Sequence, residues 1–329
     1  MRLLANNTMT RNDFITEREA TRLAWLLELE RRVPIIERVD TTDANARRLW
    51  QACELCIYLE HRTDVAPDPR QLSEAEIATL GKRALGRGEG ITDLIDDDLY
   101  WYYWLMCGGE RVGTLALDVR DWGWQQPQIM LASLYVFPEH RRRGCAGDAL
   151  VLLECACATL GLRGVWLNTH WTWQPNVRFY LNRGFWVQSW KRDIRFYRRP
   201  DSPRFRVQPD GDALTFVVDG RDAPALRAER DGTRLRLELH PSLEAGELTD
   251  RLDCIETFSV WLAVLGWPLI RDDEAWARRH GWSDCGMPEG LAYKIQVFEA
   301  YDRHRGFPVH TPRVPGLSYP SWEALQAED

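Results

Sequence analysis

One stretch of the chain, residues 134–147 (LYVFPEHRRRGCAG), combines residue types that could hold a phosphorylated ligand. An apolar run ends at Pro138, and a basic turn follows, made of Arg141, Arg142 and Arg143. Four small residues come next, before an apolar helical pattern: Gly144, Cys145, Ala146 and Gly147. Small residues let a backbone approach a ligand closely, the free N–H groups of a helix start bind anions, and arginines add charge-assisted hydrogen bonds to phosphate. The stretch therefore predicts a pyrophosphate-binding loop between a strand and a helix.

A solvated basic turn with a tight helix entry would explain the same residues, but a second motif favours the ligand-binding interpretation. The spacing Arg141-x-x-Gly144-x-Ala146 resembles the acetyl-CoA loop of the GNAT N-acetyltransferases, Q/R-x-x-G-x-G/A. Further along the chain, another segment resembles the second signature of that family: Phe179-Tyr180-x-x-x-Gly184-Phe185. Two motifs in the family's order are more specific than either motif alone.

The resemblance implies the GNAT acyl-CoA N-acyltransferase fold, an α/β (α+β) fold with a central mixed, mostly antiparallel sheet. Hydrophobic periodicity over residues 34–199 predicts a compatible order, β-α-α-β-β-β-α-β-α-β-β. Gly108-Gly109 indicates a hairpin, and Ser73 with Glu76 forms a capping box at a helix start. We expect the strand before the basic loop over residues 129–136 and the helix after it over 148–160.

Three regions are predicted along the chain. Residues 1–33 form a helical extension, residues 34–199 the GNAT acetyltransferase domain, and residues 200–329 an added α+β domain of no recognised family. Turn signals in the added domain separate four expected strands, at 204–207, 213–218, 225–229 and 234–239, and helical patterns follow at about 250–265, 272–280 and 289–304. The added domain holds 15 Lys and Arg against 23 Asp and Glu, a net charge of −8, whereas the rest of the chain has a net charge of +1.

Composition excludes some classes of function. The net charge of −7 argues against general nucleic-acid binding, and the chain has no apolar run long enough to cross a membrane. Cys53 and Cys56 form a C-x-x-C inside a helical pattern, which favours a buried helix face over zinc or redox chemistry, so no metal is expected. The first residues lack the long apolar region of a signal peptide, and a cytoplasmic protein with free thiols is expected.

The resemblance also implies roles for individual residues. Backbone groups of Tyr135 and Val136 would pair with the pantetheine arm of acetyl-CoA, and residues 141–147 would wrap its pyrophosphate. Tyr180 matches the family tyrosine near the thioester and would act as general acid, with core packing as the alternative. Asn176 would contact the cofactor, although it stands four residues before Tyr180 and the family asparagine stands seven before, so helix capping explains it equally well.

The general base is the least defined role. His170 follows the strand expected at 164–169 and could accept a proton near neutral pH, although binding to neighbouring backbone is the plainer interpretation. Asp118 and Asp121 compete with it. Trp171 and Trp173 could form an acceptor wall or simply pack in the core, and the acidic run at residues 96–98 is interpreted as a solvated loop.

These features lead to one main hypothesis and two alternatives. The main hypothesis is an acetyl-CoA-dependent N-acetyltransferase, an acyltransferase that acts directly on the primary amine of a small molecule. The alternatives are a peptide or protein N-acetyltransferase and a non-catalytic acyl-CoA-binding or scaffolding protein. For the acidic added domain, we expect a role in choosing a cationic acceptor. A dimer interface, which would make the protein a homodimer, or a stabilising cover is the alternative.

Overall fold

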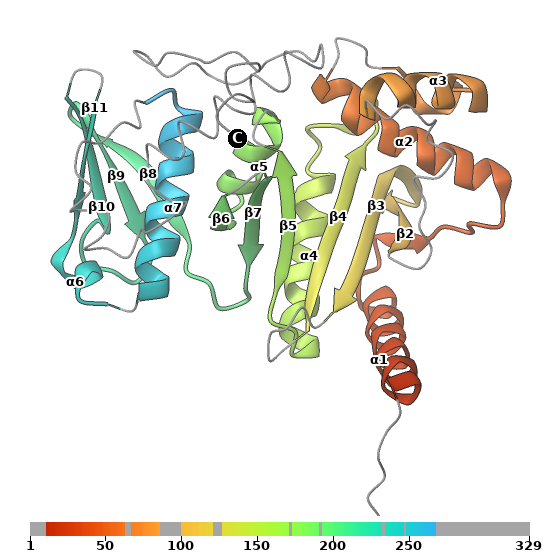
Figure 1. Ribbon diagram of the computed structural model, residues 1–329, viewed down its shortest axis with the longest axis horizontal. Coiled ribbons are helices and arrows are strands. Elements are labelled where there is room, and N and C mark those ends of the chain that lie inside the picture. Colours follow the sequence, from red (N-terminus) through yellow and green to blue (C-terminus); the bar gives the residue numbers. More distant parts are fainter. Residues whose placement is uncertain are drawn as a thin grey trace, which may run out of the picture. The chain divides into compact units, whose positions relative to one another are not determined.

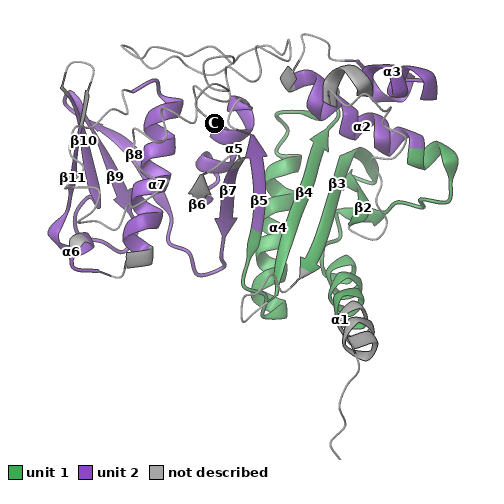
Figure 2. Ribbon diagram, viewed as in Figure 1, with its two compact units in different colours: residues 1–47, 95–165 green, residues 48–94, 166–329 purple. Residues whose placement is uncertain are grey.

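The computed structural model describes residues 11–62, 67–85, 100–120, 127–170, 173–190, 193–231, 234–246 and 248–267. The chain divides into two compact units, residues 1–47 with 95–165 (unit 1) and residues 48–94 with 166–329 (unit 2), which are coloured separately in Figure 2. Some expectations lie outside the described residues: Asp121, Trp171, the acidic run 96–98 and both helices expected beyond residue 267. In the described part of the chain, no helix is long and apolar enough to cross a membrane.

Unit 1 is an antiparallel sheet with two long helices, drawn in Figure 1. The strands follow the order β1 (Ile36–Arg38), β2 (Trp101–Cys107), β3 (Glu110–Arg120) and β4 (Gln128–Val136). Gly108 and Gly109 connect β2 to β3 with φ angles of 59° and 85°, which L side chains rarely adopt, and the predicted hairpin is confirmed. The helices are α1 (Arg11–Arg32) and α4 (Cys145–Leu160), and α4 packs against β4 and β2.

One close approach in the unit 1 sheet depends on a glycine. A Cβ atom on Gly113 of β3 would collide with the carbonyl oxygen of Tyr135 on β4. Only glycine therefore lets the end of β4 lie this close to β3. β4 also carries a bulge, because Ala116 pairs with Ser133 and Leu117 with Leu131. A bulge bends its strand, and here it bends the strand that leads into the basic loop.

Unit 2 contains the remaining elements of the predicted order. These are α2 (Ala44–Arg62), which begins in unit 1, the 3₁₀ turn η1 (Pro69–Gln71), α3 (Glu74–Leu85), β5 (Val165–His170), α5 (Gln174–Asn182), β6 (Trp186–Trp190) and β7 (Asp193–Arg198). The strands lie in the order β5-β7-β6. The capping box is confirmed, because Glu76 accepts from the Ser73 backbone N–H at 2.9 Å and the Glu76 N–H donates to Ser73 Oγ at 3.3 Å. The predicted order of elements over residues 34–199 is also confirmed.

The four strands expected after residue 200 are present. β8 (Phe205–Asp210), β9 (Ala213–Val218), β10 (Leu226–Asp231) and β11 (Arg234–Leu239) form a separate antiparallel sheet. Two helices follow, α6 (Pro241–Glu244) and α7 (Leu248–Val264).

An aromatic cluster joins this sheet to β6. Trp186 of β6 contacts Phe205 and Phe216 with ring centroids 4.9 and 5.9 Å apart, and Phe216 contacts Phe258 of α7 at 5.4 Å. In addition, Thr257 Oγ1 of α7 accepts a hydrogen bond from the Val187 backbone N–H at 2.9 Å. The strands after residue 200 therefore share a hydrophobic core with β6.

Candidate active site

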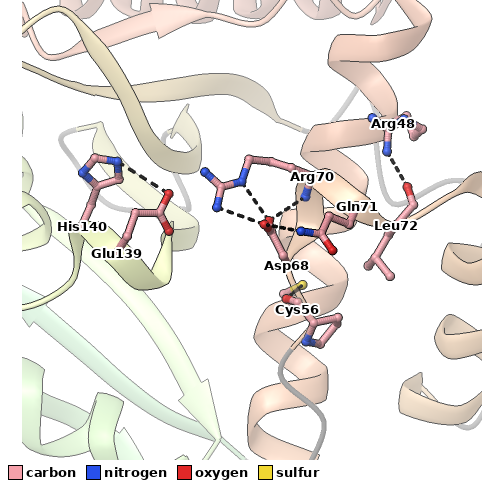
Figure 3. Close-up of polar contacts among 9 residues, drawn as sticks. Arg48, Cys56, Asp68, Arg70, Gln71, Leu72, Glu139 and His140 are labelled. Atoms are coloured by element: carbon pink, nitrogen blue, oxygen red, sulfur yellow. Dashed lines mark hydrogen bonds and ion pairs between the residues drawn. The ribbon is translucent and has the colours of Figure 1, made fainter.

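The basic loop of unit 1 runs from the end of β4 to the start of α4. The Phe137 N–H donates to the Val112 carbonyl at 2.9 Å, and the 3₁₀ turn η2 (Pro138–His140) follows. Within this turn, His140 Nε2 and Glu139 Oε1 lie 3.7 Å apart (Figure 3). The loop then takes two left-handed positions, at Arg142 with φ 60° and at Gly144 with φ 92°. Glycine suits the second position because it adopts this conformation without steric cost.

Six consecutive backbone N–H groups of the loop are available to an anion. From Arg142 to Gly147, none of them donates to a backbone carbonyl of the described chain, and the next N–H, that of Asp148, begins the helical pattern by donating to Gly144 O at 2.9 Å. Left-handed residues alternating with others turn neighbouring N–H groups toward one concavity, and the helix dipole adds positive potential there. This part of the loop has the donors that a pyrophosphate requires.

The three arginines of the loop do not share one role. Arg141 folds back onto β4, where its Nε donates to the Val136 carbonyl at 2.8 Å and its guanidinium lies 5.2 Å from the Tyr135 ring centroid. Arg142 and Arg143 have exposed side chains. All three side chains are exposed, and Arg141 is held against β4 while Arg142 and Arg143 reach solvent. Contacts of the arginines with phosphate stay a prediction.

The backbone carbonyl groups of Tyr135 and Val136 point in different directions. The Tyr135 carbonyl faces Gly113 of β3 and belongs to the ladder between β3 and β4. Backbone groups of successive residues in a strand point to opposite sides, and the Val136 carbonyl points to Arg141. The backbone of Val136 is therefore turned toward the loop, whereas that of Tyr135 contributes to the sheet.

The helix after the loop begins earlier than the sequence indicated. α4 starts at Cys145, so that Cys145, Ala146 and Gly147 form its first turn instead of preceding it. The Cys145 side chain is buried, with 6% of the residue exposed. Asp148 also lies in the first turn, where a carboxylate favours the helix start.

Tyr180 lies in α5 of unit 2, surrounded by aromatic rings. Its ring centroid is 5.2 Å from Phe179, 5.6 Å from Phe185 and 5.7 Å from Phe196. Burial raises the pKa of the Tyr180 hydroxyl above its ordinary value. The phenol is therefore protonated at neutral pH, and its hydroxyl forms no hydrogen bond within the described residues. Both the packing role and the general-acid role are compatible with this position.

His170 is the last residue of β5 and is half-buried. Its ring lies 6.4 Å from that of Trp173, whose backbone N–H donates to the His170 carbonyl at 3.0 Å. Trp173 also packs edge-on against Tyr58 of α2, with ring centroids 5.5 Å apart.

Trp173 is the N-cap residue of α5, without a side-chain cap, and Asn176 lies inside the first turn. The N-cap position of α5 is therefore Trp173 and not Asn176.

Two expectations about acidic and sulfur-bearing residues are resolved by burial. Asp118 of β3 is fully buried, and its Oδ1 lies 2.6 Å from Arg22 Nε of α1. This pairing gives Asp118 a structural role in place of the expected competition as a base. Cys53 and Cys56 lie on α2 with no exposed surface, as expected for a helix face.

Sequence reasoning missed two relationships between distant residues: the pairing of Arg22 with Asp118 and the proximity of Cys107 to Cys145. No local pattern connects residues so far apart along the chain.

A cavity of about 300 Å³ lies in unit 2, where the added strands and α7 meet β6 and β7. Trp186 and Tyr197 contribute aromatic rings, and the Tyr197 hydroxyl donates to Asp253 Oδ2 at 2.5 Å. The charged residues that line the cavity are Arg199, Asp201, Asp219, Arg221, Asp250 and Asp253. Four carboxylates against two guanidinium groups make the cavity acidic.

Residues 66–185 match the model of the Acetyltransferase (GNAT) family. No curated protein matches the chain.

Similar solved structures include three acetyltransferases. An acetyltransferase of the GNAT family from Staphylococcus aureus is 14% identical, with 50% of this chain and 98% of that chain covered and a TM-score of 0.31. The PaiA N-acetyltransferase from Thermoplasma acidophilum, in complex with coenzyme A, is 16% identical, with 50% and 97% covered and a TM-score of 0.32. Arabidopsis thaliana Naa50, in complex with a bisubstrate analogue, is 15% identical, with 49% and 95% covered and a TM-score of 0.28. At these identities and TM-scores, the likeness to the solved structures carries no argument about the role of this chain.

Proposed function

We propose, on the premise that residues 66–185 form a GNAT-family acetyltransferase domain, that the protein transfers the acetyl group of acetyl-CoA to the primary amine of a small molecule. The observation that carries the proposal is the run of six N–H donors from Arg142 to Gly147 at the start of α4. Such a run fits the pyrophosphate of a CoA thioester. Arg142 and Arg143, which are exposed beside it, supply positive charge.

Direct acetyl transfer requires two proton movements. The amine nitrogen bonds to the acetyl carbon while the carbon–sulfur bond breaks, so one proton leaves the nitrogen and one reaches the sulfur. We assign the second proton to Tyr180. Because burial raises the pKa of this phenol, it is fully protonated at neutral pH and has a proton to donate.

For the proton that leaves the amine, we assign His170 as the base. It is half-buried at the end of β5, and a neutral imidazole accepts a proton near physiological pH. The burial of Asp118 with Arg22 supports this choice by engaging one competing carboxylate. Asn176 is kept as a proposed contact to the cofactor, although it stands four residues before Tyr180 and the family asparagine stands seven before.

We further propose that the acidic region after residue 200 selects a cationic acceptor. The support is the acidic cavity, in which the rings of Trp186 and Tyr197 accompany four aspartates, since aromatic faces and carboxylates both attract organic cations. Changing Asp201 and Asp250 to Asn should raise the acceptor KM and leave CoA affinity unchanged. An unchanged KM would assign the region to a stabilising cover or a dimer interface.

The test of the main proposal is an acceptor panel with the full-length protein. CoA thiol release from acetyl-CoA would be measured with small primary amines, polyamines, and peptides that carry a free N-terminus or a lysine. We expect turnover with small amines, and faster turnover with polycationic ones. Turnover confined to peptides would favour the peptide N-acetyltransferase, and CoA binding without turnover on any amine would favour a non-catalytic acyl-CoA-binding protein.

A further inference from the structure

Two cysteines of unit 1, Cys107 and Cys145, meet at the edge of the sheet where the basic loop begins. β2 and β4 both run antiparallel to β3, which lies between them, so their carboxyl ends share one edge. The register is direct, since Leu105 pairs with Gly113 and Gly113 pairs with Val136. Cys107, the last residue of β2, lies two residues further along the strand than Leu105. It is therefore at the same edge of the sheet as the loop that follows Val136.

The two thiols are neighbours. α4 packs against β2 as well as β4, and the Sγ of its first residue, Cys145, donates to the His140 carbonyl at 4.0 Å. Burial raises the pKa of the Cys145 thiol, and the neighbouring Cys107 side chain raises it further. Both cysteines are free, and they differ in accessibility, because Cys107 is exposed while Cys145 is only 6% exposed. An accessible thiol beside a protected one is the arrangement in which a first oxidation can be resolved as a disulfide.

We propose that Cys107 and Cys145 are a modification site, at which oxidation forms a reversible disulfide that weakens cofactor binding by the basic loop. The effect on binding rests on the proposed function. Two free thiols stand further apart than the ~2.05 Å of an S–S bond. Closing that gap must draw Cys145 toward the β2–β3 hairpin. The Cys145 N–H is one of the six donors of the loop, so the disulfide displaces a donor from the pyrophosphate.

The reaction balances with hydrogen peroxide as oxidant. The Cys107 thiolate attacks one peroxide oxygen, which breaks the O–O bond and leaves a sulfenic acid and one water after protonation. The Cys145 sulfur then attacks the Cys107 sulfur, an S–S bond forms, and the sulfenic oxygen leaves as a second water. Two electrons pass from the thiols to peroxide, and a dithiol reductant reverses the step. Burial raises the pKa of the Cys145 thiol, with the neighbouring Cys107 contributing, which makes Cys107 the first thiol to react.

The experiment uses the full-length protein before and after peroxide treatment. Peptide mapping by mass spectrometry without reductant should find Cys107 and Cys145 in one cross-linked peptide, and calorimetry should find CoA affinity lowered about tenfold, the loss of roughly one charge-assisted hydrogen bond. Dithiothreitol should restore both. The Cys107→Ser variant should bind CoA normally and resist peroxide. Cys155→Ser, which alters another exposed cysteine of α4, should respond like the wild type.

Three outcomes would overturn the proposal: the absence of the cross-linked peptide, a disulfide that leaves CoA affinity unchanged, or an equal loss of affinity in the Cys107→Ser variant. Failure of the proposed function looks different, because the reduced protein would then bind no CoA at all. In that case the peptide map would still decide whether the disulfide forms.

Discussion

Arg22 and Asp118 form a buried ion pair between α1 and β3, with 2.6 Å between Arg22 Nε and Asp118 Oδ1. Arg22 is 8% exposed and Asp118 fully buried, although 96 positions separate them along the chain. Asp118 Oδ1 also accepts from the Val119 N–H at 2.9 Å. A buried carboxylate is stable only while its partner is present. The pair therefore attaches the N-terminal helix to the sheet that carries the basic loop.

Removing one partner of this pair should be costly. We expect Arg22→Met to lower the free energy of unfolding by about 3–5 kcal/mol, because Asp118 is then left buried without its guanidinium. Arg31→Met removes an exposed partner of Glu28 on the same helix and should change the free energy of unfolding far less, because water screens this pair. Urea unfolding of both variants measures the difference. The double variant Arg22→Met/Asp118→Leu should recover much of the lost stability, and equal costs for the two single variants would contradict a structural role for the pair.

The loop can be tested through the two glycines that flank α4. Gly144 and Gly161 both have left-handed backbones, with φ 92° and 66°, so substitution strains either by about 1–2 kcal/mol. Only Gly144 lies in the loop. We expect Gly144→Glu to weaken CoA binding by about tenfold or more, since it brings negative charge to the N–H donors. Calorimetry on a folded protein is the measurement, with Gly161→Glu as the control that retains CoA affinity. Equal affinities in the two variants would remove the loop from the cofactor site.

Tyr180→Phe separates chemistry from packing. The ring contacts with Phe179, Phe185 and Phe196 persist in this variant, and only the hydroxyl is lost. If that hydroxyl protonates the leaving thiolate, kcat should fall about 10²–10⁴-fold while CoA affinity stays unchanged. Tyr103→Phe is the matched control, because its hydroxyl donates to Glu30 at 3.1 Å in unit 1 and should affect stability instead of turnover. Near-normal turnover in Tyr180→Phe would leave Tyr180 as a packing residue.

The pH–rate profile tests His170. A base must be deprotonated to act. The rate should therefore rise with pH around the ordinary pKa of an imidazole, about 6.5. His170→Ala should lower the rate and remove this acidic limb. His240→Ala changes an exposed histidine at the N-cap of α6 and should keep the limb. Persistence of the limb in His170→Ala would transfer the role to another group.

Alkaline pH should destabilise the protein through a buried thiol of α7. Burial raises the pKa of Cys254 to about 12. The unfolded state releases this proton near the ordinary thiol value, about 8.5, whereas the folded state keeps it, so stability falls as pH rises between these values. The expected slope is about 1.4 kcal/mol per pH unit for this group. Cys254→Val removes the group, and urea midpoints from pH 8 to about 11 should then decline less steeply than in the wild type. Identical slopes would mean that the thiol titrates normally in the folded protein.

Local sequence determined the elements and the identity of the loop. The Ser73–Glu76 capping box is formed as the spacing predicts, and Gly108-Gly109 makes the hairpin, because both depend on residues within one turn of each other. Gly144 is a similar local signal, because a glycine after a basic turn permits the left-handed backbone at the start of α4. Turn signals likewise located the strands beyond residue 200, because glycine and aspartate favour the tight turns that separate antiparallel strands.

Tertiary structure decided which of the candidate residues can act. In the sequence, Asp118 is a carboxylate near the end of a predicted strand. Its ion pair with Arg22 forms only because α1 packs against β3. Strand register, not composition, turned the backbone of Val136 toward the loop and that of Tyr135 into the sheet. The proximity of Cys107 to Cys145 arises because β2 and β4 end at one edge. Such pairings follow from the three-dimensional packing of distant segments, which no local periodicity or spacing encodes.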